Sequence, residues 1–107
     1  MARPKKAVVD YFPHYVSSGK SLFTLESKYG NDGYAFWFKI LELLGSTENH
    51  YMDCNNIETW EFVLAKTRLN GNIVTEMLDL LSRLGSIDKD LWQAKVIWSQ
   101  NFISNLD

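Results

Sequence analysis

The sequence predicts a mainly helical winged helix-turn-helix domain with a small β-sheet and additional helices at its N-terminal and C-terminal ends. Two helical patterns are separated only by a short turn at residues 69–71. Apolar and polar residues then alternate over residues 91–98, which is typical of a strand. A short run at residues 51–54 supplies one more strand. A helix-turn-helix followed by a hairpin is the element order of a winged helix, whereas a plain helical bundle, the alternative, leaves the alternation unexplained.

The composition indicates one folded domain. The chain has 107 residues, of which 46% are hydrophobic and 14% aromatic, so it has ample material for a core. The longest apolar run, residues 35–44, contains Lys39 and Glu42 and is too short to span a bilayer. No signal peptide is visible, and the single cysteine, Cys54, excludes an internal disulfide. We therefore expect a cytoplasmic protein without a membrane segment.

The N-terminal segment is predicted to be a separate arm. Residues 1–16 contain Pro4 and Pro13 and lack helical periodicity, so they are expected to be extended, and the folded domain is expected to cover residues 17–107. The aromatic residues expected to hold this arm on the domain are Tyr11, Phe12 and Tyr15.

The first two helices are predicted from their caps and apolar patterns. Ser17 or Ser18 is expected to start the first helix, and Gly30 to end it. The second helix is expected over about residues 33–44 and to end at Gly45. It is apolar around most of its circumference, which predicts a buried scaffold helix. Its expected N-cap is Asn31 or Asp32.

The second half of the chain is predicted to hold the helix-turn-helix and the wing. Asn55 or Asn56 caps the third helix, Asn72 caps the fourth, and Gly85 ends the fourth. The third helix is predicted to carry its apolar residues at Trp60, Val63, Leu64 and Thr67. The hairpin pairs residues 86–88 with 91–98 across a turn at residues 88–90. Ser99 is expected to cap a last short helix whose apolar side comprises Phe102, Ile103 and Leu106.

Several blocks resemble a known family. The opening residues 1–6, then Asp10-Tyr11-Phe12-Pro13, and later the blocks at 29–30, 33–35, 64–66, 81–85 and 87–88 carry the resemblance. Together they resemble the N-terminal domains of phage and prophage replication proteins of Gram-positive bacteria, which are related to DnaD-type initiation proteins. The wing entry departs from that pattern, with Ser86-Ile87-Asp88 where Leu-Phe-Asp is expected. The resemblance implies a winged helix, self-association or replisome assembly, and a separate C-terminal region that binds DNA or other partners. The chain is therefore expected to be the N-terminal part of a longer protein or a short family member.

No catalytic, metal or cofactor site is predicted. His14, His50 and Cys54 lie in separate polar segments, and no CxxC or HExxH motif is present. The six glycines occur singly, so no phosphate-binding loop is indicated. We expect a protein that is not an enzyme and has no small-molecule substrate.

The charge distribution argues against the usual mode of DNA binding. The net charge is −2, and the first six residues carry three positive charges, so the remaining residues carry −5. The fourth helix would present Glu76 and Asp79 to the phosphates, which repels DNA. Basic arms, however, do enter minor grooves. The candidate DNA contacts are Arg3, Lys5, Lys6, Lys66, Arg68, Asn72, Thr75, Lys89 and Lys95.

Apolar residues on both faces of the predicted wing favour a protein interface, because a domain this small cannot easily bury both. The candidate interface comprises Tyr11, Phe12, Leu91, Trp92, Trp98, Phe102, Ile103 and Leu106. We therefore expect a non-enzymatic assembly domain of a phage-type replication initiation protein that forms a homo-oligomer and organises replication partners. The alternative is a winged-helix transcription regulator that binds DNA directly.

Overall fold

The computed structural model describes residues 19–104 and is mainly helical with one small sheet, as predicted. The elements in chain order are α1 (Lys20–Tyr29), α2 (Asn31–Ser46), the 3-10 turn η1 (Glu48–His50), β1 (Met52–Asp53), α3 (Ile57–Thr67), α4 (Gly71–Arg83), α5 (Lys89–Gln93), β2 (Val96–Ile97) and α6 (Gln100–Ser104). Strands β1 and β2 pair antiparallel, with Met52 opposite Ile97. None of the helices within residues 19–104 is long and apolar enough to cross a membrane. The predicted arm, residues 1–16, lies outside the described residues.

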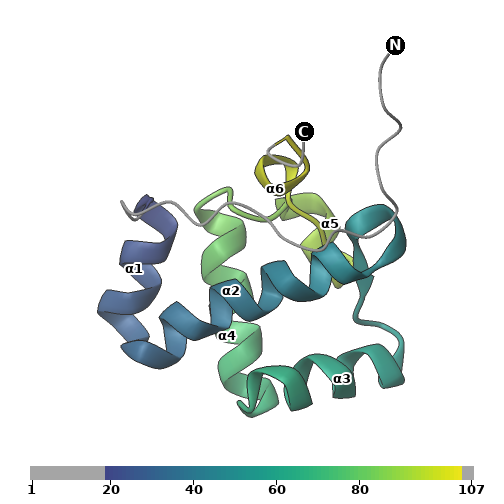
Figure 1. Ribbon diagram of the computed structural model, residues 1–107, viewed down its shortest axis with the longest axis horizontal. Coiled ribbons are helices and arrows are strands. Elements are labelled where there is room, and N and C mark those ends of the chain that lie inside the picture. Colours follow the sequence, from purple (N-terminus) through teal and green to yellow (C-terminus); the bar gives the residue numbers. More distant parts are fainter. Residues whose placement is uncertain (1–18, 105–107) are drawn as a thin grey trace.

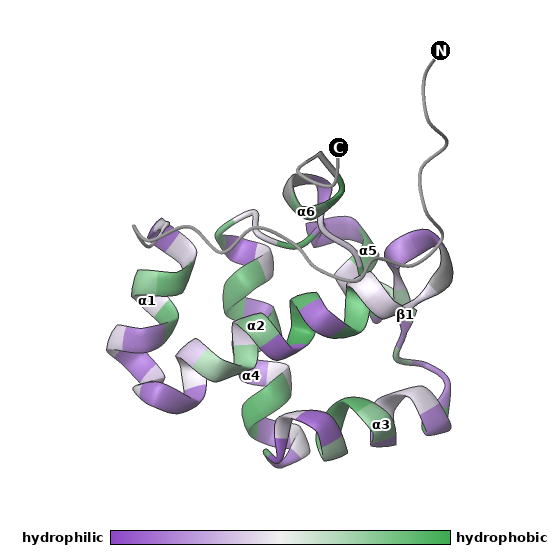
Figure 2. Ribbon diagram, in the orientation of Figure 1, coloured by the Kyte–Doolittle hydropathy of each residue, from purple (hydrophilic) through white to green (hydrophobic). Residues whose placement is uncertain are grey.

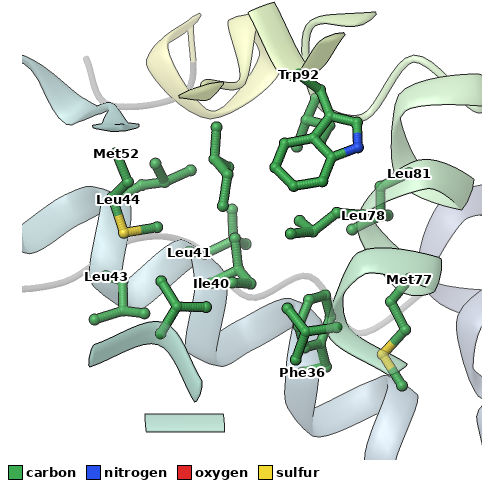
Figure 3. Packing of buried hydrophobic residues seen from close by; sticks show 14 of the residues in the cluster. Phe36, Ile40, Leu41, Leu43, Leu44, Met52, Met77, Leu78, Leu81 and Trp92 are labelled. Carbon is green, nitrogen blue, oxygen red and sulfur yellow. The ribbon is translucent and has the colours of Figure 1, made fainter. Parts of the chain in front are cut away.

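Helix α2 is the scaffold of the domain, as its sequence predicts. It crosses the middle of the molecule, and the other helices are arranged around it (Figure 1). Its side chains Phe36, Ile40 and Leu44 are at most 1% exposed. In the core they meet Leu78 of α4 and Trp92 of α5 (Figure 3). Hydrophobic burial of this single helix therefore connects the first and last parts of the fold.

A glycine corner joins α1 to α2. Gly30 ends α1 and has a φ of +66°, a conformation that L side chains rarely adopt. Its N–H donates to the carbonyl of Glu26 at 2.7 Å. Helix α2 begins at the next residue without a side-chain cap, so the predicted caps Asn31 and Asp32 are wrong. The sharp turn at Gly30 leaves no extended residue between the helices in which such a cap would sit.

Asparagine caps fix the two helices that follow. The side chain of Asn56 accepts from Thr59 N–H at 3.1 Å, as predicted for α3. In α4 the cap is Asn70, which accepts from Ile73 N–H at 2.9 Å, and the predicted cap Asn72 lies inside the first turn. The turn between α3 and α4 thus comes one or two residues earlier than the sequence suggested. Its first residue, Arg68, has a φ of +60°.

The C-terminus of α4 and the residues directly after it are held by a Schellman motif. Gly85, with a φ of +80°, donates to the carbonyl of Ser82 at 3.2 Å, and Ser86 donates to the carbonyl of Leu81 at 2.9 Å. The end of this helix near Gly85 is as predicted. Gly45, by contrast, does not end α2 but lies buried inside its last turn.

The predicted wing hairpin is replaced by a helical turn. Asp88 caps α5, because its carboxylate accepts from Leu91 N–H at 2.9 Å. This local hydrogen bond turns residues 89–93 into a helix and leaves only Val96–Ile97 as strand. Asp88 N–H still donates to the carbonyl of Trp98 at 2.7 Å, so the two ends of the predicted hairpin do lie side by side. The last helix, α6, is capped by Ser99 as predicted.

Candidate interaction surfaces

Helix α4 presents a narrow polar row on its outer side. Asn72, Glu76 and Arg83 are exposed, whereas Thr75 and Asp79 are half-buried. These are the positions that a recognition helix would turn toward a DNA groove. The row therefore has the geometry of the predicted DNA contact, and its electrostatics decide what it can bind.

Both carboxylates of this row are hydrogen-bonded within the domain. The Tyr29 hydroxyl at the end of α1 donates to Glu76 Oε1 at 2.6 Å. From the other side, Trp92 Nε1 on α5 donates to Asp79 Oδ1 at 2.7 Å. One side chain from α1 and one from α5 thus donate to carboxylates of α4, and each hydrogen bond fixes the position of the carboxylate that accepts it.

The Tyr29 bond is stable over the whole physiological pH range. Partial burial, followed by the hydrogen bond and negative charge of Glu76, raises the pKa of the Tyr29 hydroxyl to about 12, against a smaller opposing effect of Arg83. The hydroxyl therefore stays protonated and remains a donor to Glu76 on the α4 surface.

Some of the basic residues predicted to contact DNA interact with other side chains of the domain. Lys66 Nζ lies 3.0 Å from Glu42 Oε1 of α2, and Lys95 Nζ stands 4.8 Å from the centroid of the Trp92 ring. Arg68, at the end of α3, and Lys89, at the start of α5, are exposed. The remaining predicted basic contacts, Arg3, Lys5 and Lys6, lie outside the described residues. Two of the four predicted basic contacts that the structure describes are therefore engaged by other side chains.

The predicted apolar interface on the wing is largely buried instead. Trp92 is 4% exposed and Phe102 is 6% exposed, and both belong to the core cluster. The Trp92 ring points into this core from α5 (Figure 3). Trp98 and Ile103 are half-buried, and Leu91 is 38% exposed. The other predicted interface residues, Tyr11, Phe12 and Leu106, lie outside the described residues.

The largest exposed apolar side chains lie elsewhere, two of them on α3. Ile57 is 74% exposed and Phe62 is 60% exposed. On α1, Phe23 is 64% exposed, and Tyr51 before β1 is 46% exposed. Sequence reasoning missed the pair on α3, although the signal was present. The predicted apolar stripe of that helix, residues 60, 63, 64 and 67, has no place for either of them.

The histidine and the cysteine serve local structure. His50 is buried, its Nδ1 lies 3.0 Å from the carbonyl oxygen of Leu44, and its ring meets Phe102 edge-on. Cys54 is half-buried beside Asp53. Among residues 19–104, no group of three or more His, Cys, Asp or Glu side chains is arranged to hold a metal ion.

The thiol of Cys54 is expected to be slow to react. Burial, and then the charge of Asp53, raise its pKa from 9.0 to about 11, with Lys95 acting in the opposite direction. The thiolate fraction near neutral pH falls about 100-fold, and the higher nucleophilicity of a more basic thiolate recovers part of this, so alkylation by iodoacetamide should be about tenfold slower than for free cysteine. The rate should climb up to about pH 11. A rate that levels off near pH 9 contradicts the assignment, and urea-unfolded protein is the control.

Comparison with known proteins corrects the predicted family. The family model described as "Lin1244/Lin1753-like, N-terminal" matches residues 11–102, which is most of the chain. This is a different family from the DnaD-like one, so the predicted resemblance was wrong. Two of the blocks on which it rested have structural causes: Gly33 packs against the backbone of α1, and Gly85 forms the Schellman turn. Such features recur wherever helices meet closely and do not identify a family. No curated protein and no solved structure matches the chain.

Proposed function

This chain belongs to the Lin1244/Lin1753-like N-terminal family, and on that premise we propose that its folded part is a non-enzymatic assembly domain that binds a second copy of itself. The observation that supports this function is the pair of large apolar side chains, Ile57 and Phe62, left exposed on a single helix. Contact with a second copy would remove from water the apolar surface of a side chain as large and as exposed as Phe62. The predicted role in replication rested on the corrected resemblance and stays a prediction without that support.

We propose further that the fold is a winged helix with a shortened wing. Three features support it: the order of α2, β1, α3 and α4, the pairing of β1 with β2, and the hydrogen bond from Asp88 N–H to the Trp98 carbonyl. In this interpretation α5 occupies the place of the hairpin turn. A wing that folds back as a helix onto α4 does not project a strand loop toward DNA, which favours a protein partner.

The charges of α4 also favour a protein partner over DNA. Glu76 and Asp79 are fixed by Tyr29 and Trp92, so their negative charges stay on the helix that DNA would have to approach. A carboxylate on the helix that faces the DNA repels the phosphate backbone. Direct DNA binding is the alternative function. It would use the predicted basic residues at the N-terminus together with the exposed side chains of Arg68, at the end of α3, and Lys89, at the start of α5.

Sedimentation equilibrium of the full 107-residue chain, from low to several hundred micromolar, tests the proposal. We expect a reversible monomer–dimer equilibrium. A single monomeric species at every concentration contradicts self-association. Fluorescence anisotropy with a labelled DNA duplex, at low and at moderate salt concentration, tests the alternative of direct DNA binding. Tight binding that weakens with salt, by a chain that stays monomeric, would identify a DNA-binding protein instead.

A further inference from the structure

We propose that the surface used for self-association is one row of α3, which pairs antiparallel with the same row of a second copy across a twofold axis. This inference rests on the proposed function and names the site and the partner for it. The row, which we call the α3 row, consists of Glu58, Phe62 and Lys66. Residues four apart lie one above the other on a helix, so these three side chains form a single ridge.

Most of the α3 row is exposed to solvent, and Lys66 at its end contacts Glu42 of α2. Phe62 is 60% exposed, Glu58 is exposed, and the Lys66 side chain is 38% exposed. Val63 and Thr67, on the side of the helix that meets the core, are buried. Helix α3 runs along the border of the molecule, below α2 in the view of Figure 2, with hydrophobic and hydrophilic residues alternating along it. The ridge is thus available to a partner.

The order of charges along the ridge makes it complementary to itself. Glu58 precedes Phe62 by four residues, and Lys66 follows it by four, each about 6 Å away along the helix axis. When two copies pair antiparallel with Phe62 against Phe62, each Glu58 lies opposite Lys66 of the second copy. A parallel pairing would instead place like charges together. The charge pattern therefore selects the antiparallel, twofold arrangement, in which both partners use the same patch.

The neighbouring side chains suit such a contact. Ala65, three residues after Phe62 and exposed, has only a methyl group, so two helices can approach closely beside the phenylalanines. Lys66 is already held by Glu42 at 3.0 Å, which places its ammonium at the surface before a partner arrives. Because an ammonium has three donors, it can donate to Glu58 of the second copy and still donate to Glu42.

One other helix offers a comparable pattern and serves as the competing site. Phe23 on α1 is 64% exposed and has Lys20 three residues before it and Glu26 three residues after it. Helix α3 is favoured because the small and exposed Ala65 lies next to its central phenylalanine. Matched substitutions on the two helices distinguish the two sites.

Substitution of the central phenylalanine is the first test. Phe62→Glu should weaken dimerisation at least about thirty-fold, the size of an interface hot spot, because both copies lose the central apolar contact. Phe23→Glu is the matched variant, with the same residue type and similar exposure on another helix, and should leave the dimer unchanged. Circular dichroism of each variant shows that folding is retained. If Phe23→Glu dissociates the dimer and Phe62→Glu does not, the assignment to α3 is overturned.

A charge exchange tests the antiparallel geometry itself. Glu58→Lys places lysine opposite lysine in the dimer, and Lys66→Glu places glutamate opposite glutamate, so each variant alone should dimerise about tenfold more weakly or worse. Mixed together, the two variants face each other with opposite charges at both contacts and should form dimers again. Glu26→Lys on α1 makes the same change of charge away from the row and should have no effect.

Sedimentation of the mixture, with one variant fluorescently labelled, measures this recovery. Weak single variants that fail to recover on mixing overturn the antiparallel pairing. A wild-type dimer that no α3 substitution affects overturns the site while the proposed self-association stands. A wild-type chain that is monomeric at all concentrations removes the proposed function and this inference together.

Discussion

Gly33→Ala is expected to lower the free energy of unfolding by about 2–3 kcal/mol, although alanine is the better helix former. A Cβ at residue 33 would overlap the carbonyl oxygen of Leu25 and lie 2.9 Å from its carbonyl carbon and 3.0 Å from the Cβ of Tyr29. The obstacle is mainly backbone of α1, which cannot rotate away. The helix-propensity gain of about 1 kcal/mol therefore does not offset the steric cost. Urea unfolding followed by circular dichroism measures the change.

Gly71→Ala is the control for this prediction. Residue 71 is the first residue of α4, and a Cβ there would meet the Trp60 ring at 3.7 Å, an ordinary van der Waals distance. Alanine should be neutral or slightly stabilising at this position, by up to about 1 kcal/mol. A Gly33→Ala protein as stable as the Gly71→Ala protein would mean that α1 and α2 do not pack as closely as described.

Trp92→Ala should be the most destabilising of the substitutions considered, by about 3–5 kcal/mol. The Trp92 ring is 4% exposed and lies between α5 and the core residues of α2 and α4 (Figure 3). Trp92→Phe should cost less, about 1–2 kcal/mol, because it keeps most of the apolar contact and loses the hydrogen bond to the half-buried Asp79 carboxylate. Thermal melting followed by near-ultraviolet circular dichroism measures the series.

Leu91→Ala, at the neighbouring and 38% exposed position, is the control and should cost less than about 1 kcal/mol. Equal losses at residues 91 and 92 would contradict the helical turn of α5. Such a result would mean that Leu91 is as buried as Trp92, against the exposures of 38% and 4% in the structure.

The parts of the fold that the sequence predicted correctly depend on strong local signals. The apolar circumference of α2, the glycines at residues 30 and 85 and the cap at Asn56 each determine structure within a few residues. The wing was predicted wrongly because two local signals conflict there. The alternation over residues 91–98 favours a strand, whereas the Asp88 cap and burial of the Trp92 ring favour a helix, and the helix prevails.

The candidate surface was harder to predict because exposure depends on tertiary packing. Trp92 and Phe102 are apolar and were assigned to an interface, yet the α5 turn and the docking of α6 bury both. Phe62 is equally apolar and is left outside, since Val63 and Thr67 take the side of α3 that meets the core. Only the offset of Phe62 from the expected stripe, visible in the sequence, pointed to this outcome.

The two hydrogen bonds that flank α4 also limit how this domain can evolve. Lysine in place of Glu76 or Asp79 would supply the positive charge that DNA requires of this helix. The same change would remove the acceptor for the Tyr29 hydroxyl or for the Trp92 indole. A lineage moving toward DNA recognition through α4 would thus lose stability at each step in which it gained charge, and natural domains have little stability to spare. Positive charge gained on α4 would therefore come with the loss of hydrogen bonds that the described fold contains.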